Sequence, residues 1–358
     1  MVLPCGNSLC ITRNILLLFF LFETARLVHF EASAVSFTEI SMNDSSLLEQ
    51  LRLLESKYQI TGQDIGAYLE GLYETDYLNY WDYIHLDTLL SLQIKRTTFP
   101  DEEIFIMYHQ ITELYFKLIL LELKQLAKTE TFDPAFFESR IGRVNRYFEV
   151  LTQSFTVMME GMEPGQFMKF RMALLPASGF QSVQYRLIEL ACTSVQNLVD
   201  SESRNQTAGL ILSEKLDRIY WRRGATELSS GKKTLTLQRF EEKYNQQILH
   251  FAGDYEFSNV FERTQNLDWS LESNQSLKKA LRQLDENANI FWPLAHYHSA
   301  MKYLNKPPAQ IKATGGTNWQ RYLPPRFQKV VFFPQLWQEE ELDEWGKVAV
   351  QKSLVKPF

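Results

Sequence analysis

The sequence predicts an all-α protein organised as a single helical domain, and three observations lead to this fold class. Gly and Pro are sparse, with 15 and 12 among 358 residues, while long stretches are rich in Leu, Glu, Gln, Lys and Ala. Those residue types favour helices. Apolar side chains recur at three- and four-residue steps, as on one face of a helix. No strand-like alternation is long enough to propose a sheet, and no internal repeat is found.

The folded domain is expected to cover residues 42–358. Met42 precedes Asn43-Asp44-Ser45 and an apolar-periodic run, which together are typical of a helix start. Residues 1–41 are interpreted as an extension outside that domain. Two alternatives stay open for them, a disordered tail and a signal peptide, because Arg13 precedes the apolar run 15–22. That run is too short to cross a bilayer as a helix.

The strongest predicted helix covers residues 101–128. Its three- and four-step apolar positions are Ile104, Met107, Ile111, Leu114, Leu118 and Leu121. Further apolar residues fill other faces, so a helix buried on most sides is predicted. Pro100 and the acidic residues at 101–103 fit its first turn, where the helix dipole favours negative charge.

Similar patterns predict the remaining helices, each bounded by polar, Gly or Pro residues. Pro293 is read as lying in the first turn of its helix. The expected ranges are 45–57, 80–95, 134–162, 167–174, 180–199, 237–250, 277–286, 293–304 and 339–352.

Charge and cysteine content limit the classes of molecule that this protein is expected to bind and the compartment in which it is expected to occur. A net charge of -6 and a pI near 5.7 argue against nucleic acid or an anionic membrane as the main partner. Small molecules and sister subunits are expected instead. Outside the N-terminal segment Cys192 stands alone, so neither a disulfide framework nor a cysteine metal cluster is expected. This composition suggests a reducing, cytoplasmic location without a membrane partner.

Histidines provide the candidate metal ligands. His109 and Glu113 lie four residues apart on the long helix and could share a metal, but a buried His satisfied by the neighbouring carboxylate is the favoured interpretation. His296 and His298 point in nearly opposite directions on a helix and cannot chelate one ion together. A single His is sufficient for haem, because the porphyrin supplies four nitrogens and the protein one axial ligand.

Two further features could hold a ligand. Arg171 lies in a mostly apolar segment, and its guanidinium matches a carboxylate with two parallel hydrogen bonds. An internal salt bridge is the alternative. Residues 314–317, Thr-Gly-Gly-Thr, would let the backbone approach a ligand closely, although most such segments are plain turns.

Taken together, five ordered blocks resemble the tryptophan 2,3-dioxygenase family over roughly residues 75–330. The most specific are His109-Gln-Ile-Thr-Glu113-Leu-Tyr-Phe-Lys117 and Pro176-Ala-Ser178-Gly-Phe-Gln-Ser. The others are Tyr80-Trp-Asp-Tyr83-Ile-His-Leu-Asp87, Trp292-Pro-Leu-Ala-His296 and Thr314-Gly-Gly-Thr317.

The resemblance implies a helical homotetramer with haem b in each subunit. It implies dioxygen as co-substrate, which adds across the indole C2–C3 bond of L-tryptophan to give N-formyl-kynurenine. His296 matches the proximal haem ligand and Arg171 the residue that holds the substrate carboxylate. The other substrate-binding positions implied are Thr314, near the ammonium and carboxylate, together with Phe167, Ser178 and, from a neighbouring subunit, Tyr80 and Tyr83.

One departure from the family pattern concerns the distal side of haem. The family has a His there that meets the indole N–H, whereas this chain has Pro100, which can neither accept nor transfer a proton. Losing that partner should cost about 1–3 kcal/mol. Two alternatives therefore stay open. One is a haem monooxygenase or peroxygenase acting on another aromatic amino acid or indole, and the other is a binding protein without turnover.

Overall fold

The computed structural model describes residues 45–60, 62, 64–75, 78–174, 179–200, 202–207, 209–226, 231–304 and 329–347. The chain divides into two compact units, residues 1–86 and 87–358, and each is described by itself. The described residues contain no β-strand, only two isolated bridges, Val199 to Ile219 and Thr226 to Lys233. The all-α prediction is thus confirmed.

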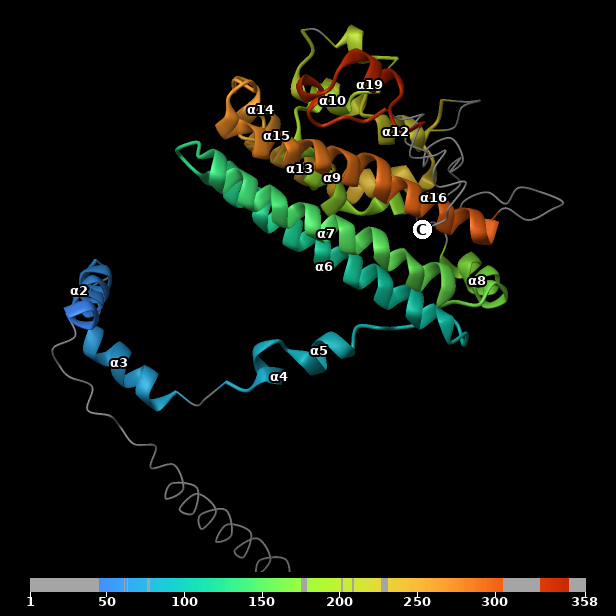
Figure 1. Cartoon of the computed structure of the whole chain (residues 1–358). Helices are drawn as coiled ribbons and strands as arrows, with labels where there is room; N and C mark the ends of the chain where they lie inside the picture. Colours follow the sequence, from blue (N-terminus) through green and yellow to red (C-terminus); the bar gives the residue numbers. More distant parts are fainter. Residues whose placement is uncertain are drawn as a thin grey trace, which may run out of the picture. The chain divides into compact units, whose positions relative to one another are not determined.

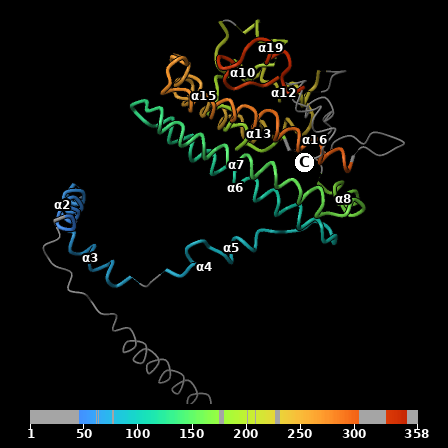
Figure 2. Tube along the Cα trace, in the orientation of Figure 1, coloured from blue at the N-terminus to red at the C-terminus, as the bar shows by residue number. Residues whose placement is uncertain are grey.

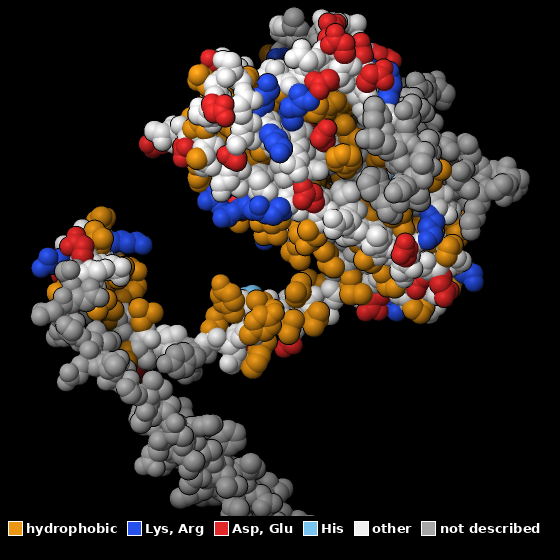
Figure 3. All heavy atoms as spheres, viewed as in Figure 1, with side chains coloured by type: hydrophobic (Ala, Val, Ile, Leu, Met, Phe, Trp, Pro, Cys, Tyr) orange, Lys and Arg blue, Asp and Glu red, His pale blue; other side chains and the backbone are white. Residues whose placement is uncertain are grey.

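The described residues of the first unit form short helices, and no described side chain among them is buried. The unit contains α2 (Ser45–Gln59), α3 (Ile65–Glu74) and α4 (Tyr80–Tyr83). Asp64 caps α3 by accepting hydrogen bonds from Gly66 N and Ala67 N at 3.2 and 3.3 Å. The prediction did not include α3. No residue of α3 or α4 is buried, and hydrophobic side chains cover much of the surface of α4 (Figure 3).

The single helix predicted for residues 80–95 is wrong. The chain leaves α4 after Tyr83, and His85 has a φ of 51°, a left-handed conformation that interrupts a helix. A short helix, α5 (Leu86–Leu90), follows. Beyond it, Gln110 accepts a hydrogen bond from Gln93 (2.7 Å) and donates one to Leu92 O (3.1 Å), so contacts with the next helix replace helical bonds.

The longest helix, α6 (Asp101–Lys128), has the predicted bounds. The acidic residues of its first turn also anchor neighbouring segments. Glu102 accepts hydrogen bonds from the backbone N–H groups of Arg96 (2.8 Å) and Thr97 (2.7 Å). Asp101 accepts one from Glu163 N at 2.6 Å. These carboxylates therefore fix the chain on both sides of α6.

Burial of α6 on most sides is not observed. Phe116, Ile119 and Leu123 lie in the core. An exposed stripe with heptad spacing, the α6 stripe, lies elsewhere on the helix and is 38–55% exposed; it consists of Met107, Ile111, Leu114, Leu118 and Leu121. By length and composition alone, α6 could also cross a membrane, but a core helix of a soluble protein passes the same test.

The second unit is arranged around α7 (Pro134–Glu160). On one side α7 packs against α6, and on another against α15 (Glu272–Glu286) and α16 (Trp292–Leu304) (Figures 1 and 2). A further layer is formed by α9 (Val183–Cys192), which packs against both α6 and α13 (Leu235–Asp254). The buried side of α7 follows the helical period and comprises Phe137, Ile141, Val144, Phe148, Leu151 and Phe155.

Shorter elements connect these helices. The helix predicted for 180–199 is divided, because Ser182 and Ser194 each cap a new helix by accepting a backbone hydrogen bond. The elements are α8 (Pro164–Phe170), η1 (Arg171–Leu174), η2 (Gly179–Gln181), α10 (Val195–Leu198), η3 (Arg204–Gln206), α11 (Leu212–Asp217), α12 (Tyr220–Gly224), α14 (Val260–Thr264), η5 (Pro334–Leu336) and α19 (Glu339–Asp343).

Pro293 lies in the first turn of α16, as the sequence predicts, but this helix does not start from a loop. A π-helical turn, η4 (Asn287–Phe291), joins α15 to α16 without interruption, so Pro293 lies inside a long helical run. A proline inside an α-helix removes a backbone donor and clashes with the preceding turn. The wider π-turn just before Pro293 accommodates this change.

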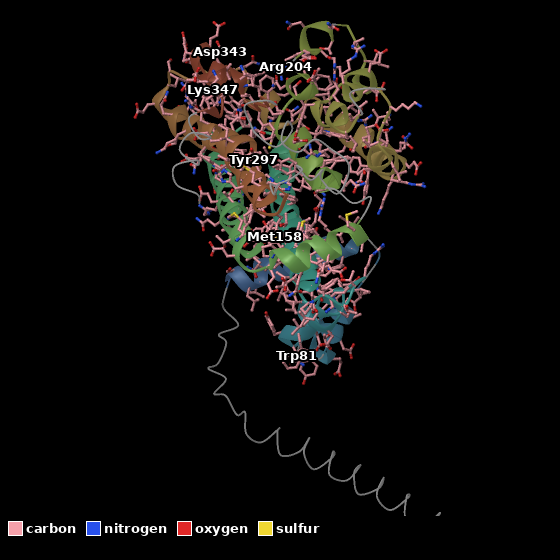
Figure 4. All side chains as sticks on the ribbon, turned by 90° about the vertical axis from the view of Figure 1, so that its right-hand side faces the viewer. Trp81, Met158, Arg204, Tyr297, Asp343 and Lys347 are labelled. Atoms are coloured by element: carbon pink, nitrogen blue, oxygen red, sulfur yellow. The ribbon has the colours of Figure 1, made fainter. Side chains whose placement is uncertain are left out.

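A buried carboxylate anchors the C-terminal segment 329–347 to this helix. Asp285 accepts hydrogen bonds from the backbone N–H groups of Phe332 (2.6 Å) and Phe333 (3.0 Å) and from Trp337 Nε1 (3.0 Å). Asn289 Nδ2 donates a fourth bond at 2.9 Å. Burial raises the pKa of Asp285 to about 6, although these bonds act in the opposite direction. Asp343 and Lys347 of this segment lie at the same end of the second unit as Arg204 (Figure 4).

Candidate active site

His296 is a half-buried imidazole among aromatic rings. Phe155 of α7 stacks on it with ring centroids 5.7 Å apart and an interplanar angle of 22°. Phe155 also contacts Trp292, one helical turn before His296, at 4.7 Å. Within the described part of the chain, neither ring nitrogen of His296 has a hydrogen-bond partner. Burial, with a smaller contribution from His109, lowers the pKa of His296 to about 4. The ring is therefore neutral at pH 7 and able to bind a metal.

His109 of α6 lies near His296. The sequence suggested that His109 pairs with Glu113, but the structure does not show this pairing. Its Nδ1 lies 2.7 Å from Phe105 O. Because a carbonyl can only accept, Nδ1 carries the proton and Nε2 is left with a lone pair. Glu113 instead accepts a hydrogen bond from Gln184 at 2.8 Å. The His109 side chain is exposed, yet desolvation by the surrounding protein lowers its pKa.

A row of aromatic rings joins α6, α8 and α16. Phe105 contacts the His109 ring at 4.1 Å and Phe167 of α8 at 6.1 Å. Phe167 in turn contacts Tyr303 of α16 at 4.6 Å. Tyr303 follows His296 by seven residues, about 10 Å along a helix axis. The structure thus brings the predicted pocket residue Phe167 to the part of the second unit that carries His296.

Arg171 begins η1 directly after α8 and is only 4% exposed. Its neighbour in sequence, Phe170, is buried, and the Phe170 ring contacts the ring of Phe105 at 5.7 Å. Burial lowers the pKa of Arg171, which means that the surroundings disfavour its charge. A buried guanidinium gains more from an anionic partner than one in water.

The other predicted site residues are only partly covered by the structure. Tyr80 and Tyr83 belong to α4 of the first unit and are 70% and 72% exposed. Thr314 and Ser178 lie outside the described residues. Pro100 is the residue immediately before α6.

The chemistry available at this site is that of a single neutral metal ligand, His296. No group of three or more His, Cys, Asp or Glu that could hold a metal ion occurs among the described residues. A metal held by His296 alone would need its other donors from a cofactor, and a porphyrin supplies four. The sequence did not reveal Phe155 or Tyr303, because core aromatics look alike in sequence until packing distinguishes them.

Comparison with known sequences finds similarity to one family. A sequence model of the family described as "Tryptophan 2,3-dioxygenase" matches residues 72–208. The tryptophan 2,3-dioxygenase of Ruegeria sp. (strain TM1040) is 29% identical over 275 residues, which is 73% of this chain and 91% of that protein. The enzyme of the same name from Paraburkholderia phytofirmans is 28% identical over 270 residues, 73% of this chain and 83% of its own length.

A shorter match is closer in sequence. The tryptophan 2,3-dioxygenase of Bacillus thuringiensis (strain Al Hakam) is 39% identical over 117 residues. This match spans 32% of the present chain and 41% of the Bacillus protein.

The low pKa of His296 predicts a pH dependence of stability. An unfolded His titrates near 6.5 and the folded one near 4, so the folded state binds fewer protons between these values. The free energy of unfolding of the metal-free protein should therefore fall as pH drops from about 6.5 to about 4. His296→Gln should have a shallower slope, by about one proton, in urea unfolding across this range. An NMR titration of His296 with its midpoint near pH 6.5 would contradict the lowered pKa of this residue.

Proposed function

Because residues 72–208 match the sequence model of the tryptophan 2,3-dioxygenase family, we propose that this chain belongs to that family and opens the pyrrole ring of L-tryptophan. Both atoms of dioxygen would enter the product, N-formyl-kynurenine. The observation that carries this proposal is the neutral His296 imidazole, which stacks on Phe155 and whose ring nitrogens have no hydrogen-bond partner among the described residues. A cytoplasmic location remains a prediction from the cysteine content.

The residues around His296 fit haem b. The ring nitrogens of His296 make no hydrogen bond within the described residues, and the low pKa of His296 favours the neutral form that binds a metal. Phe155 stacks on the same ring. An apolar, aromatic wall suits a porphyrin face. When bound, haem supplies the activation of dioxygen, and the protein supplies the axial ligand and the substrate site.

Arg171 is the residue that would bind and orient tryptophan. Its buried guanidinium would pair with the substrate carboxylate, while the nearby Phe167 ring would contact the indole. Thr314 and Ser178 are proposed to bind the substrate's polar groups, and Tyr80 and Tyr83 to come from a neighbouring subunit. These four roles rest on the family resemblance.

Pro100 favours examining a second activity. It stands at the start of α6 where the family has a proton-accepting His, so this position cannot hold the indole N–H. The second candidate is peroxide-dependent oxygenation of another aromatic amino acid or indole. The tryptophan reaction remains the first candidate, because binding and orientation through Arg171 do not need a group at position 100.

The α6 stripe supports the proposal that the protein is a homotetramer. Its five apolar side chains have the heptad spacing by which helices pair. Val150 and Val157 of α7, at 42% and 44%, are also exposed. Apolar surface of this kind marks an interface, and a second copy of the chain is the proposed occupant.

The activity is tested with reduced protein, L-tryptophan and air, followed by the absorbance of N-formyl-kynurenine. Product is expected from the parent protein, whereas His296→Ala should lose both product and Soret absorbance because it removes the haem ligand. His298→Ala is the matched control and should retain haem. No product with oxygen would refute the dioxygenase proposal, and an oxygenated product formed with peroxide from another aromatic amino acid or indole would support the second candidate.

The role of Arg171 is tested with a pair of ligands. Arg171→Ala should weaken tryptophan binding by about 2 kcal/mol or more, roughly 30-fold, while haem stays bound. Tryptamine lacks the carboxylate, so its affinity should be similar in the parent and the variant. An equal loss for both ligands would show that Arg171 shapes the pocket without holding the carboxylate.

Light scattering tests the assembly. Leu118→Glu places a charge in the α6 stripe and should yield a smaller particle than the parent tetramer. Leu235→Glu makes the same change at another exposed position, 55% exposed on α13, and should leave the mass unchanged. A tetramer that persists in Leu118→Glu would exclude the α6 stripe as an interface.

A further inference from the structure

The π-turn η4 leaves backbone carbonyl groups without their helical donors. Trp292 N–H donates to Asn287 O, five residues back, whereas a regular α-helix would direct it to Ala288 O. The next residue, Pro293, has no N–H to give to Asn289 O. The carbonyls of Ala288 and Asn289 therefore lose the donors that an α-helix would provide, directly before the turn that carries His296.

Tyr185 of α9 provides a hydrogen-bond donor for one of these two carbonyl groups. Its hydroxyl donates a hydrogen bond of 2.9 Å to Ala288 O. Ala288 is completely buried, and Tyr185 is 8% exposed. A buried carbonyl without a partner is costly, so this hydroxyl stabilises the π-turn relative to a regular helix.

Two further side-chain hydrogen bonds involve residues of the same turn. Asn287 Nδ2 donates to Asn145 of α7 at 3.2 Å. Asn289 Nδ2 donates to Asp285 at 2.9 Å. These side-chain bonds act on residues within the turn, whereas only the Tyr185 bond is given to a carbonyl that the π pattern releases.

The π-turn determines the direction in which α16 presents its side chains. Each residue of an α-helix turns the chain by about 100°, and a π-turn inserts one extra residue. Without that residue, Ala295 would take the direction that His296 now has, and His296 would be rotated by about 100° away from Phe155. The stacking of Phe155 on His296 therefore depends on the inserted residue.

We propose that Tyr185 is a positioning residue, whose hydroxyl holds the π-turn and thereby directs His296 toward the haem iron. This inference rests on the proposed function in its second half only, since the hold on the π-turn is a property of the protein without haem. Pro293 acts in the same sense, because it denies the chain the regular hydrogen bond to Asn289 O.

The test compares Tyr185→Phe, the double variant Tyr185→Phe/Pro293→Ala and a control. Tyr220→Phe removes the phenol hydroxyl of a half-buried tyrosine, which donates to Glu189 and accepts from Arg186 (2.9 Å) and has no hydrogen bond to α15 or α16 among the described residues. In the haem-free protein, hydrogen exchange of the Trp292 amide should be about tenfold faster in Tyr185→Phe and unchanged in the control. The double variant permits a regular helix, so the ring-current shift of Phe155 on His296 should disappear from its NMR spectrum.

The haem-bound protein provides the second readout. Tyr185→Phe should lose haem about tenfold faster than the parent, and the double variant should lose the electron paramagnetic resonance signature of an axial imidazole. The control should match the parent in both. Parent-like exchange at Trp292 and a retained ring-current shift in the double variant would overturn the proposal. If the parent protein takes up no haem, the haem assignment fails, while the exchange and NMR data still decide the role of Tyr185.

Discussion

A helix that crosses the protein core can carry polar groups only if each finds a partner, and this constraint organises the second unit. The run from Asp285 through η4 to α16 contains a buried carboxylate, two buried amides and a carbonyl released by the π-turn. Their partners come from α7, α9 and the segment 329–347, which are far apart in sequence. The hydrogen bonds that satisfy the polar groups of this one helical run therefore fix the positions of three other elements. They also fix the position of the imidazole that the run carries.

Much of the fold follows from patterns that the sequence shows directly. The bounds of α6 were predicted because acidic residues and a long apolar period mark it, and Pro134 marks the start of α7. The failures have physical causes. His85 adopts a left-handed conformation that propensity does not foresee in a non-glycine residue. A π-turn that receives a hydrogen bond from Tyr185 of another helix joins α15 to α16, where the sequence predicts two separate helices. In the second case the partner is tertiary, and one-dimensional patterns do not contain it.

The candidate site, like the fold, could be predicted from the sequence only in part. Chemistry alone made His296 one metal-ligand candidate among six histidines, and only the ordered blocks of the family resemblance distinguished it. Its low pKa and its stacking on Phe155 depend on packing. The burial of Arg171 agrees with its apolar sequence context. The link between Tyr185 and Ala288 spans 103 positions and has no counterpart in any local motif.

The α6 stripe has a consequence for how this protein tolerates sequence change. In a monomer, exposed positions accept most substitutions, and burial within one chain predicts which positions are constrained. Where an exposed apolar helix face is covered by identical copies, each substitution is repeated in every subunit, and the stability of one chain depends on the concentration of the others. Selection on residues 107–121 would then act on the population of chains in the cell, and a single folded copy would understate how strictly this surface is constrained.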